Sequence, residues 1–253
     1  MPFRSLAAAL LALLAACTQE PTLLGRGRDK ERPTEPGYDI GFVWDRRDGF
    51  GAGDASGALG LAAQVDAHGN AAWAYRYVTD DPALALETWF DAPGTPLTWD
   101  ESWYGRDYGS WSFADDQLPE INAHGFIHAV GAAAAFVPLV VWENPTQYTI
   151  DVHIGCRLTV MWMSQNSSDG PVIFNPPGSQ PARLVVVHRT NGLLSTVLSD
   201  HVLEPTTEHP EVTLDVWATL SPVDEIAWSV RSSGDAGWVY VLDDCSLELL
   251  AKR

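Results

Sequence analysis

Apolar and polar residues alternate over several short segments in the second half of the chain. Ile150, Val152 and Ile154 alternate with Asp151 and His153, and the pattern recurs within residues 158–162, 212–216, 226–230, 238–242 and 247–249. A period of two puts every second side chain on the same face of an extended strand. Each segment therefore predicts a strand with one buried face.

Turn-forming residues separate these segments, at residues 166–171, 175–181, 191–192, 208–210 and 232–237. Short strands at this spacing, without helical periodicity between them, predict an all-β fold: an antiparallel, jelly-roll-like β-sandwich or a barrel. The first half is less regular, and we expect its strands near residues 40–44, 59–65, 71–78, 84–90 and 135–142. A short helix is the alternative for the alanine-rich residues 129–135.

The N-terminus has the pattern of an export signal. Arg4 precedes residues 6–16, an unbroken run of alanine and leucine. At about 1.5 Å per residue, a helix of this length crosses only about half of a hydrocarbon core of about 30 Å. The run therefore predicts a signal peptide and not a membrane span.

The run ends in Leu14-Ala15-Ala16-Cys17, which resembles the lipobox of bacterial lipoproteins. The resemblance implies that residues 1–16 are removed and that Cys17 carries the lipid that attaches the protein to a membrane of the bacterial cell envelope. In that family an Asp after the cysteine retains the protein at the inner membrane, whereas Thr18 stands here. We therefore expect the outer membrane or the cell surface where the host has two membranes. An ordinary secretory signal with a chance cysteine is the alternative.

Residues 17–37 are expected to form a flexible tether. They contain three prolines, three glycines and mixed charges, and too few apolar residues to offset the entropy of ordering. Such a coil spans roughly 25 Å root-mean-square. No second linker follows, so residues 38–253 are predicted to form a single β-sandwich domain.

The predicted domain is strongly acidic. It holds 29 acidic and 10 basic residues, because four acids and five bases precede residue 38. This balance argues against nucleic acid as a partner and against adhesion to anionic lipid through charge. It suits a neutral ligand, a cation, or solubility alone.

Two cysteines remain after Cys17. Cys156 and Cys245 both fall in expected strands, and an exported protein lies in an oxidising compartment where they can form one disulfide. Two unpaired buried thiols are the alternative.

Several short motifs resemble secreted bacterial jelly-roll domains of the carbohydrate-binding-module type. They are GNAAWAY at residues 69–75, PEIN at 119–122, VPLVVW at 137–142, VHIG at 152–155 and GWVYVLDDCSL at 237–247. The resemblance covers roughly residues 71–250 and implies a jelly-roll sandwich. It implies carbohydrate as the ligand only weakly, since fold does not fix function.

Tryptophan is unusually frequent, with 11 in the chain, and it clusters around residues 99–111. The candidate ligand-binding residues in this cluster are Trp99, Trp103, Tyr104, Arg106, Asp107, Tyr108 and Trp111. Prolines and glycines interrupt the stretch, so we expect a loop. Its rings and charges are those that a glycan platform uses. The alternative is that the rings fold back and cap one end of the sandwich.

The other tryptophans are read from strand patterns. Trp162, Trp228 and Trp238 are predicted to lie in the core, because they alternate with their strand neighbours. Trp142 and Trp217 are left undecided.

Metal and cofactor signals are weak, and no firm cofactor is predicted. The adjacent acids Asp243 and Asp244 are the candidate for a structural calcium, although calcium needs six to eight oxygen ligands. His124 and His128 have the spacing of a zinc-peptidase motif, but Gly125 stands where that motif needs Glu. We read the two histidines as structural or surface residues.

Enzyme signatures are mostly missing, and no catalytic residues are identified. The chain has no Gly-x-Ser-x-Gly motif, no Walker loop and no dinucleotide fingerprint. The expectation is a non-enzymatic envelope lipoprotein that binds carbohydrate or another surface ligand. One alternative is a glycan hydrolase or lyase that uses acids between Trp99 and Glu120. The other is a structural envelope protein that contacts other proteins.

Overall fold

The computed structural model describes residues 38–48, 50–51, 55–56, 62–79, 89–91, 93–100, 110–112, 119–129, 136–165, 172–191, 194–206, 209–232 and 237–251. These residues belong to a compact unit that extends from Glu35 to Arg253. Their one helical element is a 3-10 turn, η1 (Trp89–Asp91). No helix in this part of the chain is long and apolar enough to cross a membrane.

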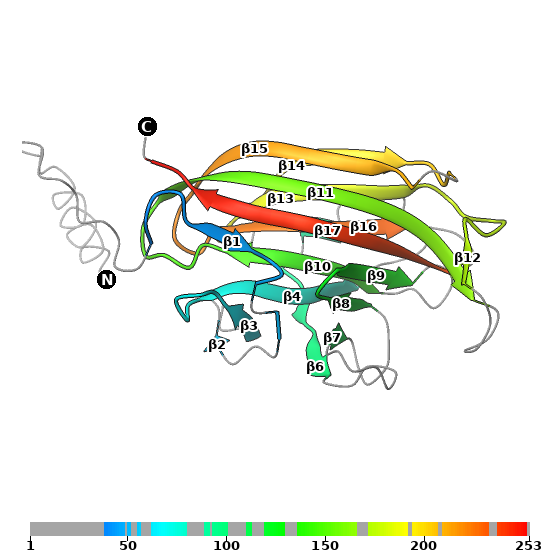
Figure 1. The fold of residues 1–253 in the computed structure, drawn as a ribbon, viewed down its shortest axis with the longest axis horizontal. Coiled ribbons are helices and arrows are strands. Elements are labelled where there is room, and N and C mark those ends of the chain that lie inside the picture. The colour runs from blue at the N-terminus through cyan, green and yellow to red at the C-terminus, as the bar shows by residue number, and fades with distance from the viewer. Residues whose placement is uncertain are drawn as a thin grey trace, which may run out of the picture. The chain divides into compact units, whose positions relative to one another are not determined.

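The described strands form two sheets (Figure 1). In the first, sheet 1, the hydrogen-bonded order is β12-β11-β17-β9-β8-β7-β6, with β15 beside β11 and β1 beside β17. Its strands are β1 (Val43–Asp45), β6 (Thr98–Asp100), β7 (Ser110–Ser112), β8 (Glu120–Asn122), β9 (Gly125–Ala129), β11 (Ile150–Gln165), β12 (Val172–Phe174), β15 (Glu211–Leu220) and β17 (Trp238–Leu249).

In sheet 2 the order is β14-β13-β16-β10-β4-β3-β2, with β5 beside β4. Its strands are β2 (Ala55–Ser56), β3 (Ala62–Val65), β4 (Ala71–Thr79), β5 (Thr95–Pro96), β10 (Phe136–Glu143), β13 (Ala182–Thr190), β14 (Leu194–Leu203) and β16 (Glu225–Ser232).

Every pairing between the described strands is antiparallel. The chain passes repeatedly from one sheet to the other, as from β10 to β11, from β12 to β13 and from β16 to β17. Many neighbours in a sheet are therefore distant in the sequence, which is the arrangement of a jelly-roll sandwich. The predicted all-β antiparallel fold is confirmed.

The main core lies between the sheets. Sheet 1 contributes alternate residues of β11, such as Ile154 and Leu158, and sheet 2 contributes Trp73, Trp142 and Trp228. The rings of Trp73 and Trp228 meet edge to face, with centroids 5.8 Å apart, a favourable geometry for aromatic pairs.

Sheet 2 is also buried on its outer face. A second apolar cluster there joins Val141, Val185 and Ala227 to Phe90 of η1. A sheet that is covered on both faces needs apolar residues at consecutive positions. The runs in β10 and β13 meet this need, because residues 137–142 and 184–187 are all buried.

Four of the five strands expected in the first half are present in part or whole. Residues 71–78 and 135–142 correspond to β4 and β10, and residues 40–44 and 59–65 are represented by the shorter β1 and β3. The strand expected near residues 84–90 is not confirmed: η1 stands at its end, and residues 84–88 lie outside the described part of the chain. Residues 130–135, where a helix was the alternative, also lie outside it.

Candidate ligand-binding surface

The outer face of sheet 1 is exposed where β11, β15 and β17 lie side by side. In β15, Val212 and Leu214 are buried, while residues 211, 213, 215, 217 and 219 are exposed. The same alternation runs through β11 and β17, because successive side chains of a strand point to opposite faces. Sheet 1 faces the viewer in Figure 1, with these three strands in front of sheet 2.

An aromatic row crosses this surface near the end where β17 finishes. Trp217 of β15 is the direct partner of His153 of β11, and His153 is the direct partner of Glu248 of β17. The indole and imidazole rings stack, with centroids 4.9 Å apart and an interplanar angle of 29°. Trp217 nevertheless remains 55 % exposed. The stack limits the rotamers of the indole while leaving much of it open to a ligand.

Carboxylates flank the histidine on both sides. Asp215 Oδ1 lies 2.5 Å from His153 Nε2, and Glu248 Oε2 lies 4.0 Å from His153 Nδ1. Two positions further along the same strands, Thr219 of β15 donates a 2.5 Å hydrogen bond to Asp151 of β11. The side chains of Asp215 and Glu248 are 68 % and 46 % exposed, so their oxygens can accept further hydrogen bonds.

Gly155 adjoins the row and has no side chain, and we call this position the Gly155 notch. This glycine lies between Asp215 and Ser246 in the register of the three strands. A Cβ built on it meets His153 Cε1 and Ser246 Oγ at an ordinary 3.9 Å, and its φ is not among the positive values. Neither crowding nor backbone conformation in the described surroundings therefore demands a glycine here. Glycine inside a strand otherwise often marks the close approach of a ligand or of another backbone.

The two arginines at the rim are already paired. Arg157 Nε donates to Glu211 at 2.6 Å, and Arg47 Nη1 lies 3.5 Å from Asp244. Among the ion pairs of the described residues, Asp215 and Glu248 meet His153 and no lysine or arginine. The surface is therefore acidic around its aromatic row.

This arrangement has the chemistry of a sugar-binding face. An indole supplies an apolar surface for the C–H groups of a pyranose ring, and neighbouring carboxylates and a histidine bind hydroxyl groups. Because the residues stand on three hydrogen-bonded strands, the site is held in place before a ligand arrives.

The predicted aromatic platform is wrong for Trp111. Trp99 and Trp111 lie opposite each other in β6 and β7, and neither forms part of an exposed loop. Trp111 is only 2 % exposed and donates from Nε1 to the carbonyl oxygen of Gly51 at 3.2 Å. Trp99 packs against the core and contacts Trp111 and Phe50 with ring centroids 5.8 Å apart. Both rings fold inward, as expected for the alternative in which they cap one end of the sandwich.

The other five platform candidates, Trp103, Tyr104, Arg106, Asp107 and Tyr108, lie outside the described residues. Of the acids proposed for a hydrolase or lyase, Glu101, Asp107, Asp115 and Asp116 also lie outside them. Glu120 is described, and its side chain is fully buried with a hydrogen bond from Asn122 at 2.9 Å. In this structure it is not placed to meet a polysaccharide.

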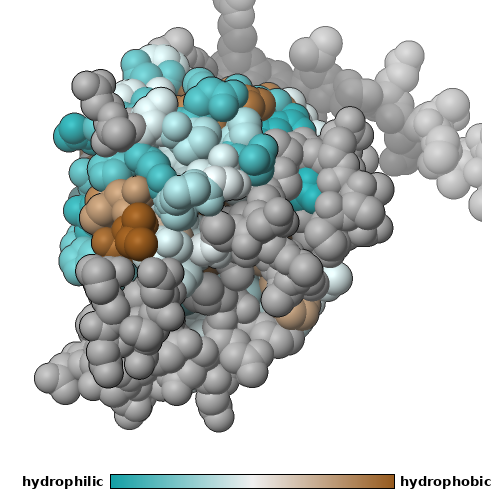
Figure 2. All heavy atoms as spheres, turned by 90° about the vertical axis from the view of Figure 1, so that its right-hand side faces the viewer, coloured by the Kyte–Doolittle hydropathy of each residue, from teal (hydrophilic) through white to brown (hydrophobic). Residues whose placement is uncertain are grey.

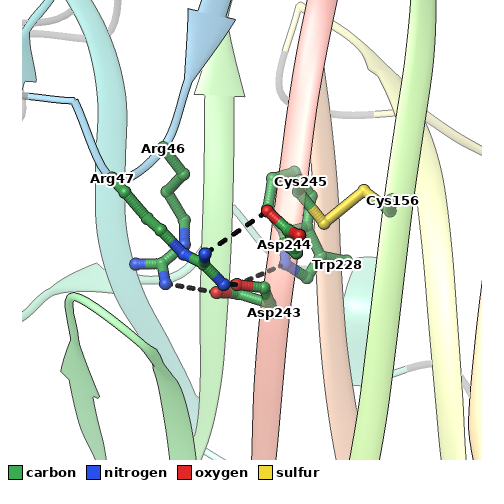
Figure 3. The surroundings of a disulfide bond; sticks show 7 residues. All are labelled: Arg46, Arg47, Cys156, Trp228, Asp243, Asp244 and Cys245. Atoms are coloured by element: carbon green, nitrogen blue, oxygen red, sulfur yellow. Dashed lines mark hydrogen bonds and ion pairs between the residues drawn. A yellow bond between two sulfur atoms is a disulfide. The ribbon is translucent and has the colours of Figure 1, made fainter.

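Asp243 and Asp244 do not form a calcium site. Adjacent residues of a strand point to opposite faces, and Asp243 is buried while Asp244 is 60 % exposed. Asp243 forms an ion pair with Arg46 and accepts a hydrogen bond from Trp228 Nε1 at 3.2 Å (Figure 3). Burial raises the pKa of Asp243, and these two donors oppose that rise. No group of three or more metal-binding side chains is found among the described residues.

Cys156 and Cys245 form a disulfide, so this prediction is confirmed (Figure 3). They are direct partners in β11 and β17 and both face the core. The bond therefore joins two of the three strands that carry the exposed surface.

The other tryptophans differ in burial according to which face of its strand each one occupies. Trp162 and Trp228 are in the core as predicted, at 2 % and 1 % exposure, and the undecided Trp142 is fully buried. The prediction that Trp238 lies in the core is wrong. Its side chain is partly exposed, because Val239 and Val241 take the inward positions of β17. Sequence reasoning missed Trp217, although the inward positions of Val212 and Leu214 put residue 217 on the opposite face.

A second group of exposed apolar residues lies in β12. Val172, Ile173 and Phe174 are 45 %, 38 % and 51 % exposed. Figure 2 looks onto the end of the sandwich that carries β12 and shows an apolar patch among hydrophilic atoms. Among the described residues, Ser164 and Gln165 of β11 pair with Ile173 and Val172, and the ring of His209 lies 5.3 Å from that of Phe174. We do not assign a ligand to this group.

In the comparisons with known proteins, the matches are all solved structures. No protein-family model matches the chain, and the search of curated proteins gives no match. A CBM4 domain shares 15 % identity over 70 % of this chain and 94 % of that one, with a TM-score of 0.32. The CBM22-1 xylan-binding domain of Paenibacillus barcinonensis Xyn10C shares 11 % over 85 % and 99 %, with a TM-score of 0.31.

The N-terminal cellulose-binding domain of Cellulomonas fimi β-1,4-glucanase C shares 14 % over 71 % of this chain and 91 % of that one, with a TM-score of 0.31. Identities and TM-scores this low carry no argument about function.

Proposed function

We propose that this protein is a lipid-anchored, non-enzymatic glycan-binding protein of the bacterial cell envelope. In this proposal Cys17 holds the protein on the membrane, and the outer face of sheet 1 binds the glycan through Trp217, His153 and the carboxylates beside them.

The exposed Trp217–His153 stack is the observation that supports the glycan site. An indole that is 55 % exposed on a rigid sheet leaves apolar area in water, and stacking against a sugar ring removes it. Gly155 adds room beside the stack, and Asp215 and Glu248 add hydrogen-bond acceptors. A protein partner could also cover an exposed tryptophan, and the binding experiment below distinguishes the two.

The anchor rests on the lipobox-like sequence that ends in Cys17. A strongly acidic domain has little means of holding an anionic membrane by charge, so we expect the acyl chains to provide the attachment. The test is fractionation of cells that express the wild-type protein or Cys17→Ser. We expect the variant to be soluble or to remain uncleaved. Unchanged membrane localisation would contradict the anchor.

The glycan site is tested by binding to a glycan array, followed by titration of the best ligand against Trp217→Ala. We expect the variant to lose at least about tenfold in affinity, which corresponds to about 1.4 kcal/mol. Trp238→Ala is the matched control, because Trp238 is a partly exposed tryptophan on the same outer face. It should bind as the wild type does. Full binding by Trp217→Ala, or a folded protein that binds no glycan, would overturn the proposal.

A further inference from the structure

The charges around Trp217 indicate which kind of glycan would fit the surface. Asp215 and Glu248 are exposed, and Asp151 lies in the next row of β11. Arg157, the arginine among the outward residues of β11, is held by Glu211. The surface thus offers a ligand several negative charges and no free guanidinium among the described residues of these three strands.

The whole domain strengthens this local charge. From residue 38 onward the chain has 29 acidic and 10 basic residues. Such a balance repels polyanions and attracts cationic ligands over about one Debye length, which is about 10 Å at 0.1 M salt. A polysaccharide of uronic acids would meet like charges at the site and across the domain.

The aromatic row also favours a cation. An ammonium group that lies near an indole face is attracted by the electrons of the ring, and tryptophan is the strongest partner of this kind. Asp215 and Trp217 are two residues apart on the same face of β15, so an amino substituent on a sugar that stacks on Trp217 would have a carboxylate beside the indole. An ammonium group would then interact with both the exposed indole and a neighbouring carboxylate.

We propose that the ligand is a polysaccharide of amino sugars whose amino groups are free and protonated. This inference rests on the proposed glycan site and specifies its ligand. The sugar ring stacks on Trp217 beside the Gly155 notch, and the ammonium groups pair with Asp215 and Glu248.

The test uses three hexamers with the same β-1,4-linked backbone, made of glucose, N-acetylglucosamine or glucosamine. They differ only in the group at C2: hydroxyl, acetamide or amine. Calorimetric titration is carried out in low salt, at a pH where the amine is protonated. Exposed charge pairs each contribute about two- to fivefold in affinity, so two carboxylates predict a preference of about tenfold for the amine.

Asp215→Asn and Glu248→Gln should each lower this preference by about two- to fivefold. Their affinity for the glucose hexamer should fall less than their affinity for the glucosamine hexamer, because the amide keeps a hydrogen-bond acceptor but loses the charge. Glu204→Gln is the control, because it removes the same charge from an exposed acid that follows β14 in the other sheet. It should keep the wild-type preference. Trp217→Ala should lose affinity for all three hexamers.

The outcomes separate the two proposals. Equal affinity for the three hexamers, lost in Trp217→Ala, would overturn the amino-sugar inference and leave the glycan site standing. If the glucosamine hexamer binds more tightly than the other two and keeps its full affinity in Trp217→Ala, the inference would also be overturned. Charge alone, without stacking on Trp217, would then bind that hexamer. No binding of these hexamers or of any array glycan by the folded protein would overturn both.

Discussion

The outer faces of the two sheets carry similar charged residues in opposite surroundings. On sheet 2, Arg76 pairs with Glu143 and with Glu225, and all three side chains are at most 1 % exposed. On sheet 1, His153, Asp215 and Glu248 have side chains that are 28 %, 68 % and 46 % exposed.

The buried charges of sheet 2 hold a neighbouring segment in place. Arg189 lies 3.5 Å from Glu225 and donates from Nε and Nη2 to the carbonyl oxygen of Phe90, at 3.1 and 2.7 Å. Phe90 belongs to η1, which packs on this face. The charges there pair with one another and with the backbone, whereas those of sheet 1 remain available to a ligand. Both sites contain carboxylates, and burial distinguishes the structural charge network of sheet 2 from the candidate binding site of sheet 1.

Arg76→Met should have the largest effect on stability, because it leaves Glu143 and Glu225 buried without this partner. We expect a loss of about 3–5 kcal/mol in the free energy of unfolding, measured by urea denaturation. Arg157→Met is the control on sheet 1, since the Arg157 side chain is 66 % exposed and its pair should contribute about 1 kcal/mol or less. Equal losses in the two variants would contradict the contrast between the faces.

The disulfide should contribute nearly as much. It closes a loop with a sequence separation of 89 residues, for which the chain-entropy model gives about 4.6 kcal/mol. Urea denaturation with and without reductant measures this contribution. The Cys156→Ala, Cys245→Ala double variant should be destabilised and insensitive to reductant. A wild-type protein that reductant leaves equally stable would show that the bond contributes nothing.

His128 should make stability fall in mild acid. Its imidazole lies 3.1 Å from Phe136 O and 3.4 Å from Ser232 O, and burial lowers its pKa to about 4. The unfolded chain binds this proton below about pH 6.5, so stability falls as the pH drops from about 6.5 to about 4, by about 3 kcal/mol in total. Urea denaturation across this range measures the slope. His128→Asn should flatten it, and an unchanged slope would contradict the assignment to His128.

Substitutions at Gly155 should have the smallest effect on stability and a large effect on binding. Valine suits a strand, so Gly155→Val should change the free energy of unfolding by less than about 1 kcal/mol. Its side chain should fill the notch and weaken glycan binding, whereas Gly155→Ala should retain most of it. Thermal denaturation and calorimetry check the two quantities. Wild-type affinity in Gly155→Val would exclude the notch from the site.

The sequence predicted the fold well because sheet 1 has one open face. Alternation in residues 150–154 and 212–216 is typical of strands with one wet side, and β11 and β15 have such a side. Residues 226–230 alternate as well, but β16 is buried on both faces. The strands of sheet 2 have buried residues at consecutive positions, so their pattern does not reveal which side faces the core. The sequence also does not show which face Trp238 occupies. Residues 238–242 are apolar at both alternating positions of β17, so only the strand pairings decide which of them face the core.

The candidate site was harder to predict than the fold. Density of aromatic residues pointed to Trp99 and Trp111, but β6 and β7 pair and turn both rings inward. Trp217 is a single tryptophan in an ordinary strand, and its stacking partner His153 is distant in the sequence. Only the register between β11 and β15 brings the two together.

Fluorine NMR of protein labelled with 5-fluorotryptophan would locate the ligand. The chain has 11 tryptophans, and Trp217→Phe assigns the resonance of Trp217 by its disappearance. On addition of a glycan that binds, we expect the Trp217 signal to shift, while those of the buried Trp111, Trp142 and Trp228 stay in place. A bound glycan that shifts Trp103 or Trp99 and leaves Trp217 unmoved would contradict it.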